Sequence, residues 1–515
     1  MRQNNLFLYL GIGSSLLTAC SGKQKSETDI TKPNVIFIVA DDIGFGDLSC
    51  NGSNTIHTPN VERISNNGVR FTDAHSVAAT STPSRYALFT GEYSWRRKDT
   101  GIATGDAGMV IRPEQTTIAD LFQEKGYVTG AVGKWHLGLS DKAGGQDWNG
   151  FITPGPADIG FQYSYIMAAT GDRVPCVWVE NQRVVNLDPN DPIEVSYKEP
   201  FSGEPLGKDH PEMLYKLRPS LNHGHDQAIV NGISRIGYMK GGKAALWEDE
   251  NIADSITYNA VEFIKNNKDN PFFLYVGTND IHVPRYPHKR FEGKSGMGKR
   301  GDAILSFDWT VGCVLDALEE AGIADNTLIV LTSDNGPVVD DGYADQAVEL
   351  LGEHKPWAHF RGGKYSSFEA GTRVPFLVSW PAVVKPGVSD ALVSQIDLFA
   401  SMAALLGSEE SVTDIKDSQN YLNTLLGNDK EGRPYIVEAA YSLSVSDGEW
   451  KYIAPSNAPT FNKLTNTELG NSTEEQLYHL ATDIGEQQNV AEQYPEKVEY
   501  LKKILDSEKS KTIQR

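Results

Sequence analysis

Three runs of apolar, largely β-branched residues constrain the fold of this chain more than any other feature. They occupy residues 34–40 (NVIFIVA), 272–276 (FFLYV) and 328–331 (LIVL). None of them alternates between apolar and polar residues, which is typical of strands covered on both faces in a parallel sheet. Helical patterns, with apolar residues three and four apart, lie between the runs at 117–125, 254–266 and 306–321. The alternation predicts an α/β fold in which helices sandwich a large, mostly parallel sheet.

Polar residues follow each of these runs. Asp41 and Asp42 end the first, His282 comes shortly after the second, and Asp334 and Asn335 follow the third. Ligands of open parallel sheets bind at the carboxyl ends of the strands, so we expect these side chains to converge. The carboxylate and amide oxygens favour a hard cation such as Ca²⁺ or Mg²⁺ over zinc. The alternative is that they are ordinary turn residues.

Ser81 lies in the stretch 79–91 (ATSTPSRYALFTG), which resembles a helix start. Thr82 can cap the helix, and Pro83 suits its first turn. Ser81 would then lie just outside the helix N-terminus, where free amides and the helix dipole attract an anion, with Arg85 one turn further in. This arrangement suits a nucleophile, although an incidental Ser and Arg on a capped helix would read the same way.

Further cations and imidazoles are expected at the same edge. Lys134 and His136 follow a short apolar stretch, and Lys364 ends the sequence RGGK at 361–364. Together with Arg85, His282 and a hard cation, they describe a pocket for the ester of a tetrahedral oxyanion. Sulfate and phosphate esters are the natural candidates.

Several motifs resemble those of the type I sulfatases, members of the alkaline phosphatase superfamily. Residues 81–91 resemble the first sulfatase signature, and residues 126–136 (GYVTGAVGKWH) resemble the second. The motifs at 41–42, 282–284, 333–336 and 361–364 occur in the order expected of that family, and the resemblance spans roughly residues 33–490. It implies an alkaline phosphatase-like fold and a sulfuric ester hydrolase.

The resemblance also implies how residue 81 would work. Ser81 would be oxidised to formylglycine (3-oxoalanine) by a radical maturase and would act as its hydrated aldehyde. One hydroxyl of this geminal diol attacks sulfur and the other expels sulfate by elimination, whereas an ordinary serine would leave a stable sulfate ester. Ca²⁺, with Mg²⁺ second, would be bound by the side chains of Asp41, Asp42, Ser81 (as modified), Asp334 and Asn335.

The same resemblance implies roles for the remaining side chains. Arg85 and Lys134 would hold the modified residue and the sulfate, and Lys364 would bind sulfate with His282. His282 would be the acid that protonates the departing alcohol, and His136 the base for the elimination. The residues themselves allow these two roles to be exchanged.

The region 140–242 is rich in Gly, Pro, Asp and Asn, and we expect long loops and small strands that carry substrate contacts. Its segment 170–178 resembles carbohydrate sulfatases that act on sulfated galactose or N-acetylgalactosamine, so mucin-type or glycosaminoglycan chains are the expected substrates. Asp172 and Arg173 would bind sugar hydroxyls or pair with each other. Cys176 would line the pocket or pack beneath it, and His223 is expected on the substrate loop.

Two other functions remain open from the sequence. The first is a phosphomonoester or phosphonate hydrolase on the same fold. Residues 223–226 (HGHD) resemble the extra ligands that a two-zinc phosphatase needs, but their place in the loop region, away from the strand ends, favours a substrate-loop feature. The second is a sulfated-glycan binder without catalysis. The net charge of −21 argues against a nucleic-acid partner, because such proteins need a basic face.

The two ends of the chain predict further parts. Arg2, an apolar stretch to residue 19 and the lipobox-like LTAC at 17–20 indicate a lipoprotein signal peptide over 1–19 and lipidation of Cys20. A polar tether (20–32) would anchor the protein to the bacterial cell envelope, periplasmic or at the outer membrane. A catalytic domain is expected over 33–425. A smaller C-terminal α+β domain is expected over 426–515, with strands at 450–453 and 476–480 and a helix at 495–505.

Overall fold

A mixed, mostly parallel sheet of ten strands organises the chain in the computed structural model, which describes residues 32–412 and 417–511. Five neighbouring strands, in the spatial order β13-β1-β12-β4-β5, run parallel. Their bounds are β1 (Asn34–Ala40), β4 (Val128–Lys134), β5 (Tyr163–Met167), β12 (Phe272–Gly277) and β13 (Thr327–Ser333). The flanking strands are β2 (Gly68–Phe71), β14 (Phe376–Ser379), β15 (Gly387–Ser389), β6 (Trp178–Glu180) and β7 (Arg183–Val184). The three buried runs of the sequence therefore form the predicted strands at the centre of the sheet.

The strand register brings the carboxyl ends together. Ala40 pairs with Ser333, and Gly277 pairs with both Val39 and Gly133. Side chains that follow β1, β12, β13 and β4 are thus delivered to one edge, as the rule for parallel sheets predicts.

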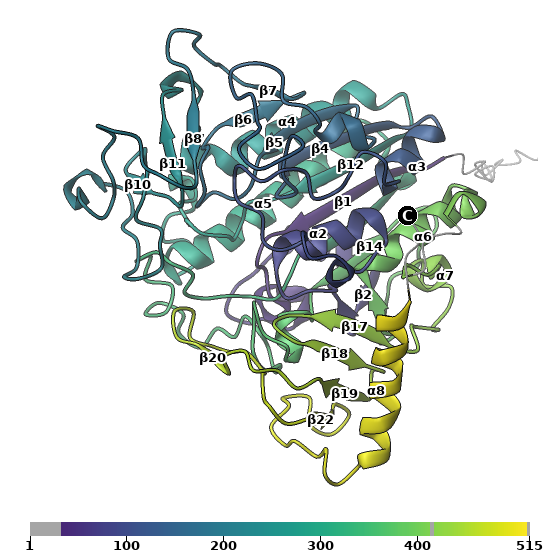
Figure 1. Ribbon diagram of the computed structural model, residues 1–515. Helices are drawn as coiled ribbons and strands as arrows, with labels where there is room; N and C mark the ends of the chain where they lie inside the picture. Colours follow the sequence, from purple (N-terminus) through teal and green to yellow (C-terminus); the bar gives the residue numbers. More distant parts are fainter. Residues whose placement is uncertain (1–31, 413–416, 512–515) are drawn as a thin grey trace, which may run out of the picture. The chain divides into compact units, whose positions relative to one another are not determined.

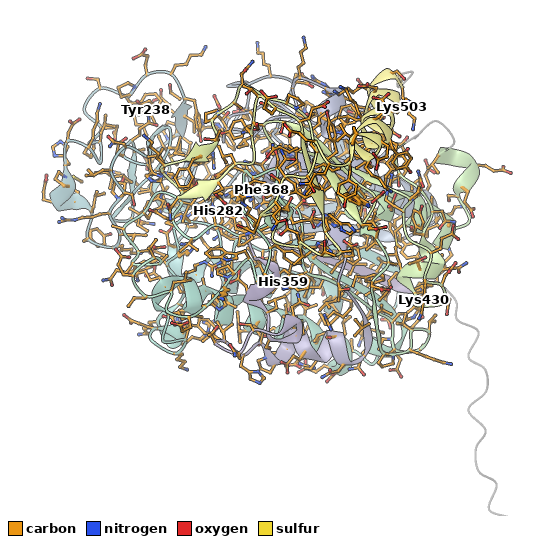
Figure 2. The ribbon with its side chains drawn as sticks, turned by 90° about the horizontal axis from the view of Figure 1, so that it is seen from below. Tyr238, His282, His359, Phe368, Lys430 and Lys503 are labelled. Atoms are coloured by element: carbon orange, nitrogen blue, oxygen red, sulfur yellow. The ribbon has the colours of Figure 1, made fainter. Side chains whose placement is uncertain are left out.

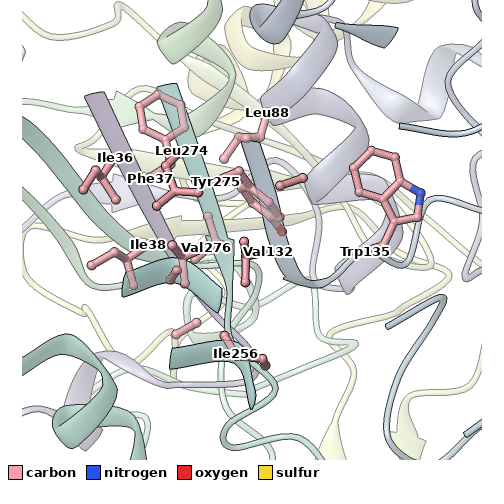
Figure 3. Close-up of a cluster of buried hydrophobic side chains, with 14 of the residues drawn as sticks. Ile36, Phe37, Ile38, Leu88, Val132, Trp135, Ile256, Leu274, Tyr275 and Val276 are labelled. Atoms are coloured by element: carbon pink, nitrogen blue, oxygen red, sulfur yellow. The ribbon is translucent and has the colours of Figure 1, made fainter. Parts of the chain in front are cut away.

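Helices cover both faces of the sheet (Figure 1). One layer holds α1 (Pro59–Asn66), α4 (Ile252–Asn267) and α5 (Gly298–Glu320), and the other holds α2 (Ser81–Thr90), α3 (Ile118–Glu124) and α6 (Leu398–Leu405). Leu88 of α2 lies on one side of the central strands and Ile256 of α4 on the other (Figure 3). The strands are apolar on both faces because both faces are buried.

A second, antiparallel sheet forms near the C-terminus. Its order is β17-β18-β19-β22, with bounds Ile436–Ala439, Leu443–Ser446, Trp450–Ile453 and Gln476–His479. The helix α8 (Pro495–Ser510) packs along it (Figure 1). A separate hairpin of β20 (Phe461–Asn462) and β21 (Thr467–Glu468) lies between β19 and β22 in the sequence. The predicted α+β architecture of this part is confirmed, and the boundary at residue 425, within the compact unit that begins at Lys32, stays a prediction.

A buried ion network ties this sheet to the catalytic part. Lys451 of β19 is fully buried, and its Nζ lies 3.0 Å from Glu369 Oε1 and 3.1 Å from Glu438 Oε2. His75 Nδ1 lies 2.7 Å from Glu438 Oε1. Charges buried in this way are costly unless every partner is present, so the network fixes how the two parts meet.

The region 140–242 contributes more to the main sheet than we expected. Its strands β5, β6 and β7 extend that sheet, and only β8 to β11 are small separate pairs (Glu194–Ser196, Ile229–Val230, Ile233–Ser234 and Tyr238–Lys240).

The remaining strands and α-helix are short, namely β3 (Ala74–His75), α7 (Leu422–Leu425) and β16 (Val393–Ser394). In residues 32–412 and 417–511, every helix is too short or too polar to cross a bilayer. The predicted signal peptide, Cys20 and all of the tether except Lys32 lie outside the described residues.

Candidate active site

Ser81 is the first residue of α2, so the helix starts earlier than we predicted. Thr80 is the N-cap and makes no side-chain cap bond. Thr82 is not the cap: its hydroxyl donates to the carbonyl of His136 (3.0 Å) and accepts from the amide of Ala103 (3.1 Å). That pair of bonds joins α2 to the segment carrying His136, which explains why a threonine stands there.

Arg85 and His136 both contact the Ser81 hydroxyl. Arg85 Nε donates to Ser81 Oγ at 3.0 Å, since residues four apart share a helix face, and His136 Nδ1 lies 3.2 Å from the same oxygen. Arg85 also donates from Nη2 to Asp334 Oδ2 at 2.8 Å and from Nη1 to the Tyr275 hydroxyl. A buried guanidinium therefore fixes residue 81 and one of the acidic residues together.

Lys134 and Lys364 each bridge carboxylates at the end of the sheet. Lys134 Nζ lies 2.6 Å from Asp41 Oδ2 and 3.5 Å from Asp334 Oδ2. Lys364 Nζ lies 2.8 Å from Asp42 Oδ2 and 2.9 Å from Asp341 Oδ2. The six predicted cations and carboxylates, Arg85 among them, thus form one buried cluster, extended by Asp341.

The carboxylates of this cluster lie close together, and their pKa values are shifted in opposite directions. Burial, with Asp334 and Asp42 nearby, raises the pKa of Asp41 well above its ordinary value. Burial also acts to raise the pKa of Asp334, but Arg85 and Lys134 outweigh it and hold that pKa far below the usual range. A divalent cation placed among these groups would relieve the repulsion that Asp41 experiences.

The oxygen donors fit a metal ion. Asp41 Oδ1 and Asn335 Oδ1 are buried and, among the described residues, have no hydrogen-bond partner. The Asn335 amide donates to Asp42 Oδ1 (2.8 Å), which turns its own oxygen inward. Ligand atoms of Asp41, Asp42 and His282 lie within 4.8 Å of one another. Orphaned buried oxygens are costly, so their presence at this point supports a hard cation there.

The two histidines differ in which nitrogen faces the site. His136 Nε2 lies 3.0 Å from the Ala103 carbonyl, which can only accept, so Nε2 carries the proton and the Nδ1 lone pair faces Ser81. His282 is the reverse: its Nδ1–H donates to the Val283 carbonyl at 2.7 Å, and Nε2 faces Asp42 Oδ2 at 3.9 Å. Burial lowers the pKa of both imidazoles well below 6.5, assisted by Lys134 at His136 and by Lys364 at His282.

A cavity of about 220 Å³ opens over these groups. It is lined by predicted residues, namely Ser81, His136, Asp172, Arg173, His223, His282 and Lys364. His225, which belongs to the HGHD segment of the sequence, also lines it. Sequence reasoning missed the other lining residues, which are Thr80, Ile102, Ile236, Asp341, Tyr365, Asn462, Leu464 and Thr465. They come from loops and from the β20–β21 hairpin, and none carries a motif of its own.

Asp172 and Arg173 pair with each other and also lie where they could contact a sugar, so both interpretations of these residues are compatible with the structure. Arg173 Nη1 donates to Asp172 Oδ1 at 2.9 Å, and His225 Nε2 lies 2.9 Å from Asp172 Oδ2, yet Asp172 and Arg173 both line the cavity. Cys176 is different: its side chain is fully buried, its Sγ lies 3.8 Å from the Arg173 carbonyl, and it does not line the cavity. Of the two placements we considered for Cys176, the structure has it packing beneath, so its inclusion among the substrate contacts is wrong.

The histidines of the HGHD segment are not arranged as the ligands of a zinc ion. Ring centroids of His223 and His225 are 6.2 Å apart, and His225 is engaged by Asp172. In the part of the chain that the structure describes, the groups able to hold an ion are Asp41, Asp42 and His282, and His75, Glu369 and Glu438. In the second group Lys451 already occupies the centre as the counter-ion.

A serine at a helix start, held by an arginine and an imidazole beside a cluster for a hard cation, is the arrangement of a hydrolase of oxyanion esters. The Sulfatase family model matches residues 33–408, and the chain belongs to the sulfatase family. Sulfatases typically use a formylglycine and a divalent metal, in agreement with this acidic cluster. The predicted fold class and the assignment as a sulfatase are confirmed.

Relatives of known activity include bacterial and human enzymes. The chain is 52% identical over 515 residues to an N-acetylgalactosamine-6-O-sulfatase of Bacteroides thetaiotaomicron, covering 99% of this chain and 100% of the relative. It is 28% identical to human arylsulfatase A, covering 92% of this chain and 87% of that one.

Solved structures agree with this placement. A protein from the glycosaminoglycan metabolism of B. thetaiotaomicron superposes with a TM-score of 0.91 at 54% identity, over 93% of this chain and 100% of the other. A sulfatase from Pseudoalteromonas, at 21% identity and a TM-score of 0.68, covers 93% of this chain and 90% of its own and shares the fold.

Proposed function

We propose that this sulfatase removes O-sulfate from galactose-type residues of sulfated glycans, with 6-O-sulfated N-acetylgalactosamine of glycosaminoglycans as the first candidate. The observation that carries the proposal is one cavity in which Ser81, His136, His282 and Lys364 face a hydrogen-bonding wall that includes Asp172. Near-complete coverage at 52% identity with the N-acetylgalactosamine-6-O-sulfatase of B. thetaiotaomicron supports the choice of sugar.

Formylglycine and Ca²⁺ are part of the proposal. Formylglycine, formed from Ser81 by a radical maturase, would supply a hydrated aldehyde as nucleophile, and Ca²⁺ would supply positive charge for the sulfate oxygens. Asp41, Asp42, Asp334 and Asn335 would hold the ion, with modified residue 81 beside it. The unpartnered oxygens of Asp41 and Asn335 support this choice over zinc, which prefers nitrogen and sulfur.

The protein's own side chains prepare the reaction around that centre. Arg85 holds the oxygen of residue 81 at 3.0 Å and so sets its direction of attack. Lys134 and Lys364 supply ammonium groups that neutralise the sulfate, and both are preorganised by carboxylates. Because these groups are buried, their charges act in a medium where they are worth more than in water.

The hydrogen bonds of the histidines support distinct roles for them. His136 presents an unprotonated Nδ1 to the oxygen of residue 81, which suits a base that removes its proton. His282 anchors its Nδ1–H on a carbonyl and turns Nε2 into the cavity. Because burial and Lys364 lower its pKa, the acid role requires that Nε2 take up a proton beside the bound anionic sulfate ester, and that proton would then pass to the departing sugar oxygen. We therefore propose His136 as base and His282 as leaving-group acid.

Asp172, Arg173 and His223 are proposed as the contacts to the sugar. The Asp172 carboxylate is held by Arg173 and His225, so it is presented at a fixed orientation in the cavity. A carboxylate and guanidinium fixed in this way recognise adjacent hydroxyls through directional hydrogen bonds.

A substrate panel tests the proposal. Initial rates of desulfation should be highest with 6-O-sulfated N-acetylgalactosamine or galactose, compared with the 4-O-sulfated isomers and with 6-O-sulfated N-acetylglucosamine. Turnover of 4-nitrophenyl phosphate above that of 4-nitrophenyl sulfate, with a zinc requirement, would instead support the phosphoesterase. An unmodified Ser81 peptide, in mass spectra of protein from a host with the maturase, would support a glycan binder.

We also propose that the chain is a lipoprotein of the bacterial cell envelope, acylated on Cys20. The apolar stretch ending in LTAC at 17–20 supports this. Radiolabelled palmitate should enter the wild-type protein and not the Cys20→Ala variant. Membrane association of that variant would contradict the anchor.

A further inference from the structure

A second polar groove lies beside the catalytic cavity, on the other side of the β20–β21 hairpin. Trp357, His359, Asn466 and Gln487 are among its lining residues, and its volume is about 350 Å³. We call it the hairpin groove. Its volume is at the lower end of the range of small-molecule sites, which suits one or two sugar rings.

Two separate segments of the chain line both sites. In the first, Arg361 and Gly362 line the hairpin groove, whereas Lys364 and Tyr365 line the catalytic cavity. In the second, Asn466 lines the groove and the preceding residue, Thr465, lines the cavity. Neighbouring Cα atoms are about 3.8 Å apart, so the sites are separated by little more than the hairpin itself.

A bidentate salt bridge between Arg361 and Glu468 holds these two segments against each other. Arg361 Nε and Nη2 donate to Glu468 Oε2 and Oε1 at 2.7 Å and 3.0 Å. The arginine of the RGGK motif therefore does not join the cluster around residue 81. Instead it fixes the end of the hairpin, and it leaves the groove without an uncompensated charge from this pair.

The groove presents an aromatic side chain with free polar groups. Trp357 is half-buried, whereas His359 (labelled in Figure 2), Asn466 and Gln487 are exposed. Within residues 32–412 and 417–511, the Trp357 indole N–H, the His359 ring nitrogens and the Asn466 amide make no hydrogen bond. Gln487 uses only Nε2, toward the Gly485 carbonyl at 2.6 Å. An indole beside free planar amides matches a ligand with an apolar face and many hydroxyls.

We propose that the hairpin groove binds a second sugar residue of the glycan chain whose sulfated residue occupies the catalytic cavity. The inference rests on the proposed glycan sulfatase function. It extends that function by assigning a distal subsite, which would hold the part of the glycan beyond the sugar that loses sulfate. The two wall segments shared with the cavity commit the groove to this occupant, because a glycan chain that leaves the cavity has to cross only the hairpin to reach the groove.

Comparison of two substrates tests the subsite. Values of kcat/KM are measured for a 6-O-sulfated N-acetylgalactosamine monosaccharide and for a tetrasaccharide that carries the same residue. We expect His359→Ala, Gln487→Ala and Trp357→Leu each to lower the tetrasaccharide value about twofold to tenfold, because each removes hydrogen bonds or ring contact of ordinary strength. The monosaccharide value should stay within about twofold, since none of these side chains lines the catalytic cavity.

Controls separate the possible outcomes. His57→Ala removes an exposed histidine that lines neither site and should change neither value. Trp357→Leu keeps an apolar side chain against Phe360, and its unfolding temperature reports whether the packing survives. Equal losses on both substrates, or unchanged tetrasaccharide values in all three variants, would overturn the subsite. Failure of the wild-type protein to desulfate either substrate would overturn the underlying glycan sulfatase function instead.

Discussion

Removing the imidazole of His282 should lower kcat for the desulfation of sugar sulfates far more than kcat for activated aryl sulfates. A sugar alcohol is a poor leaving group and needs a proton as the bond to sulfur breaks, whereas 4-nitrophenolate leaves unaided. His282 Nε2 faces the cavity because Nδ1 is bound to the Val283 carbonyl at 2.7 Å. A positioned general acid contributes about 10²–10⁴-fold, or ~2.7–5.4 kcal/mol of barrier.

The expected magnitudes follow from that difference. In His282→Ala, kcat on a 6-O-sulfated sugar should fall by about 10²–10⁴-fold, and kcat on 4-nitrophenyl sulfate by less than about tenfold. In His136→Ala, both should fall by about 10²–10⁴-fold, because Nδ1 of His136 contacts the oxygen of residue 81 rather than the leaving group. Both rates are measured at saturating substrate and compared with wild type.

The reverse pattern would refute the assignment. If His136→Ala spares 4-nitrophenyl sulfate and His282→Ala does not, the two roles are exchanged. Equal losses on both substrates in the two variants would show that neither imidazole protonates the leaving group. Circular dichroism and thermal unfolding of each variant exclude misfolding as the cause, and His282→Gln, which keeps the bond to the Val283 carbonyl within reach, serves as the conservative control.

Three further outcomes are expected. Chelation of divalent metal should abolish turnover and Ca²⁺ should restore it, with about one ion per chain by elemental analysis in wild type and far less in Asp41→Asn. Lys451→Met should lower the free energy of unfolding, measured in urea, by about 3–5 kcal/mol, because it leaves Glu369 and Glu438 buried without their shared cation. The stability that His136 contributes should decline as pH falls below 6.5, because its lowered pKa means that the unfolded chain binds the proton more readily. The unfolding temperature of the wild type should therefore fall relative to that of His136→Ala between pH 6.5 and 5, and a constant difference would contradict this.

The catalytic centre was predictable because its residues stand at strand ends. Asp41 follows β1 directly and Asn335 follows β13 within two residues, so the parallel register alone brings them together. Lys364 was predictable from the RGGK motif that it ends. The start of α2 was misjudged by two residues because Thr82 uses its hydroxyl to bond His136 and Ala103, and no local pattern indicates a tertiary partner of that kind.

The walls around that centre were not predictable. Asp341 and Leu464 come from loops without periodicity or motif, and they line the cavity only because the chain returns there. The β20–β21 hairpin that carries Leu464 is a separate two-stranded sheet, and it lies more than a hundred residues beyond β13 in the sequence. Local sequence rules have no access to such long-range approaches.

By itself the sequence determined the fold class, the catalytic edge and the family, because buried parallel strands and the residues that end them are set by local pattern and by a fixed register. Only the tertiary structure decided which nitrogen each histidine turns inward, that Cys176 packs beneath the cavity, and that Arg361 serves the hairpin rather than the residue-81 cluster. Those outcomes depend on hydrogen-bond partners and packing contacts from distant segments, which exist only after the chain has folded.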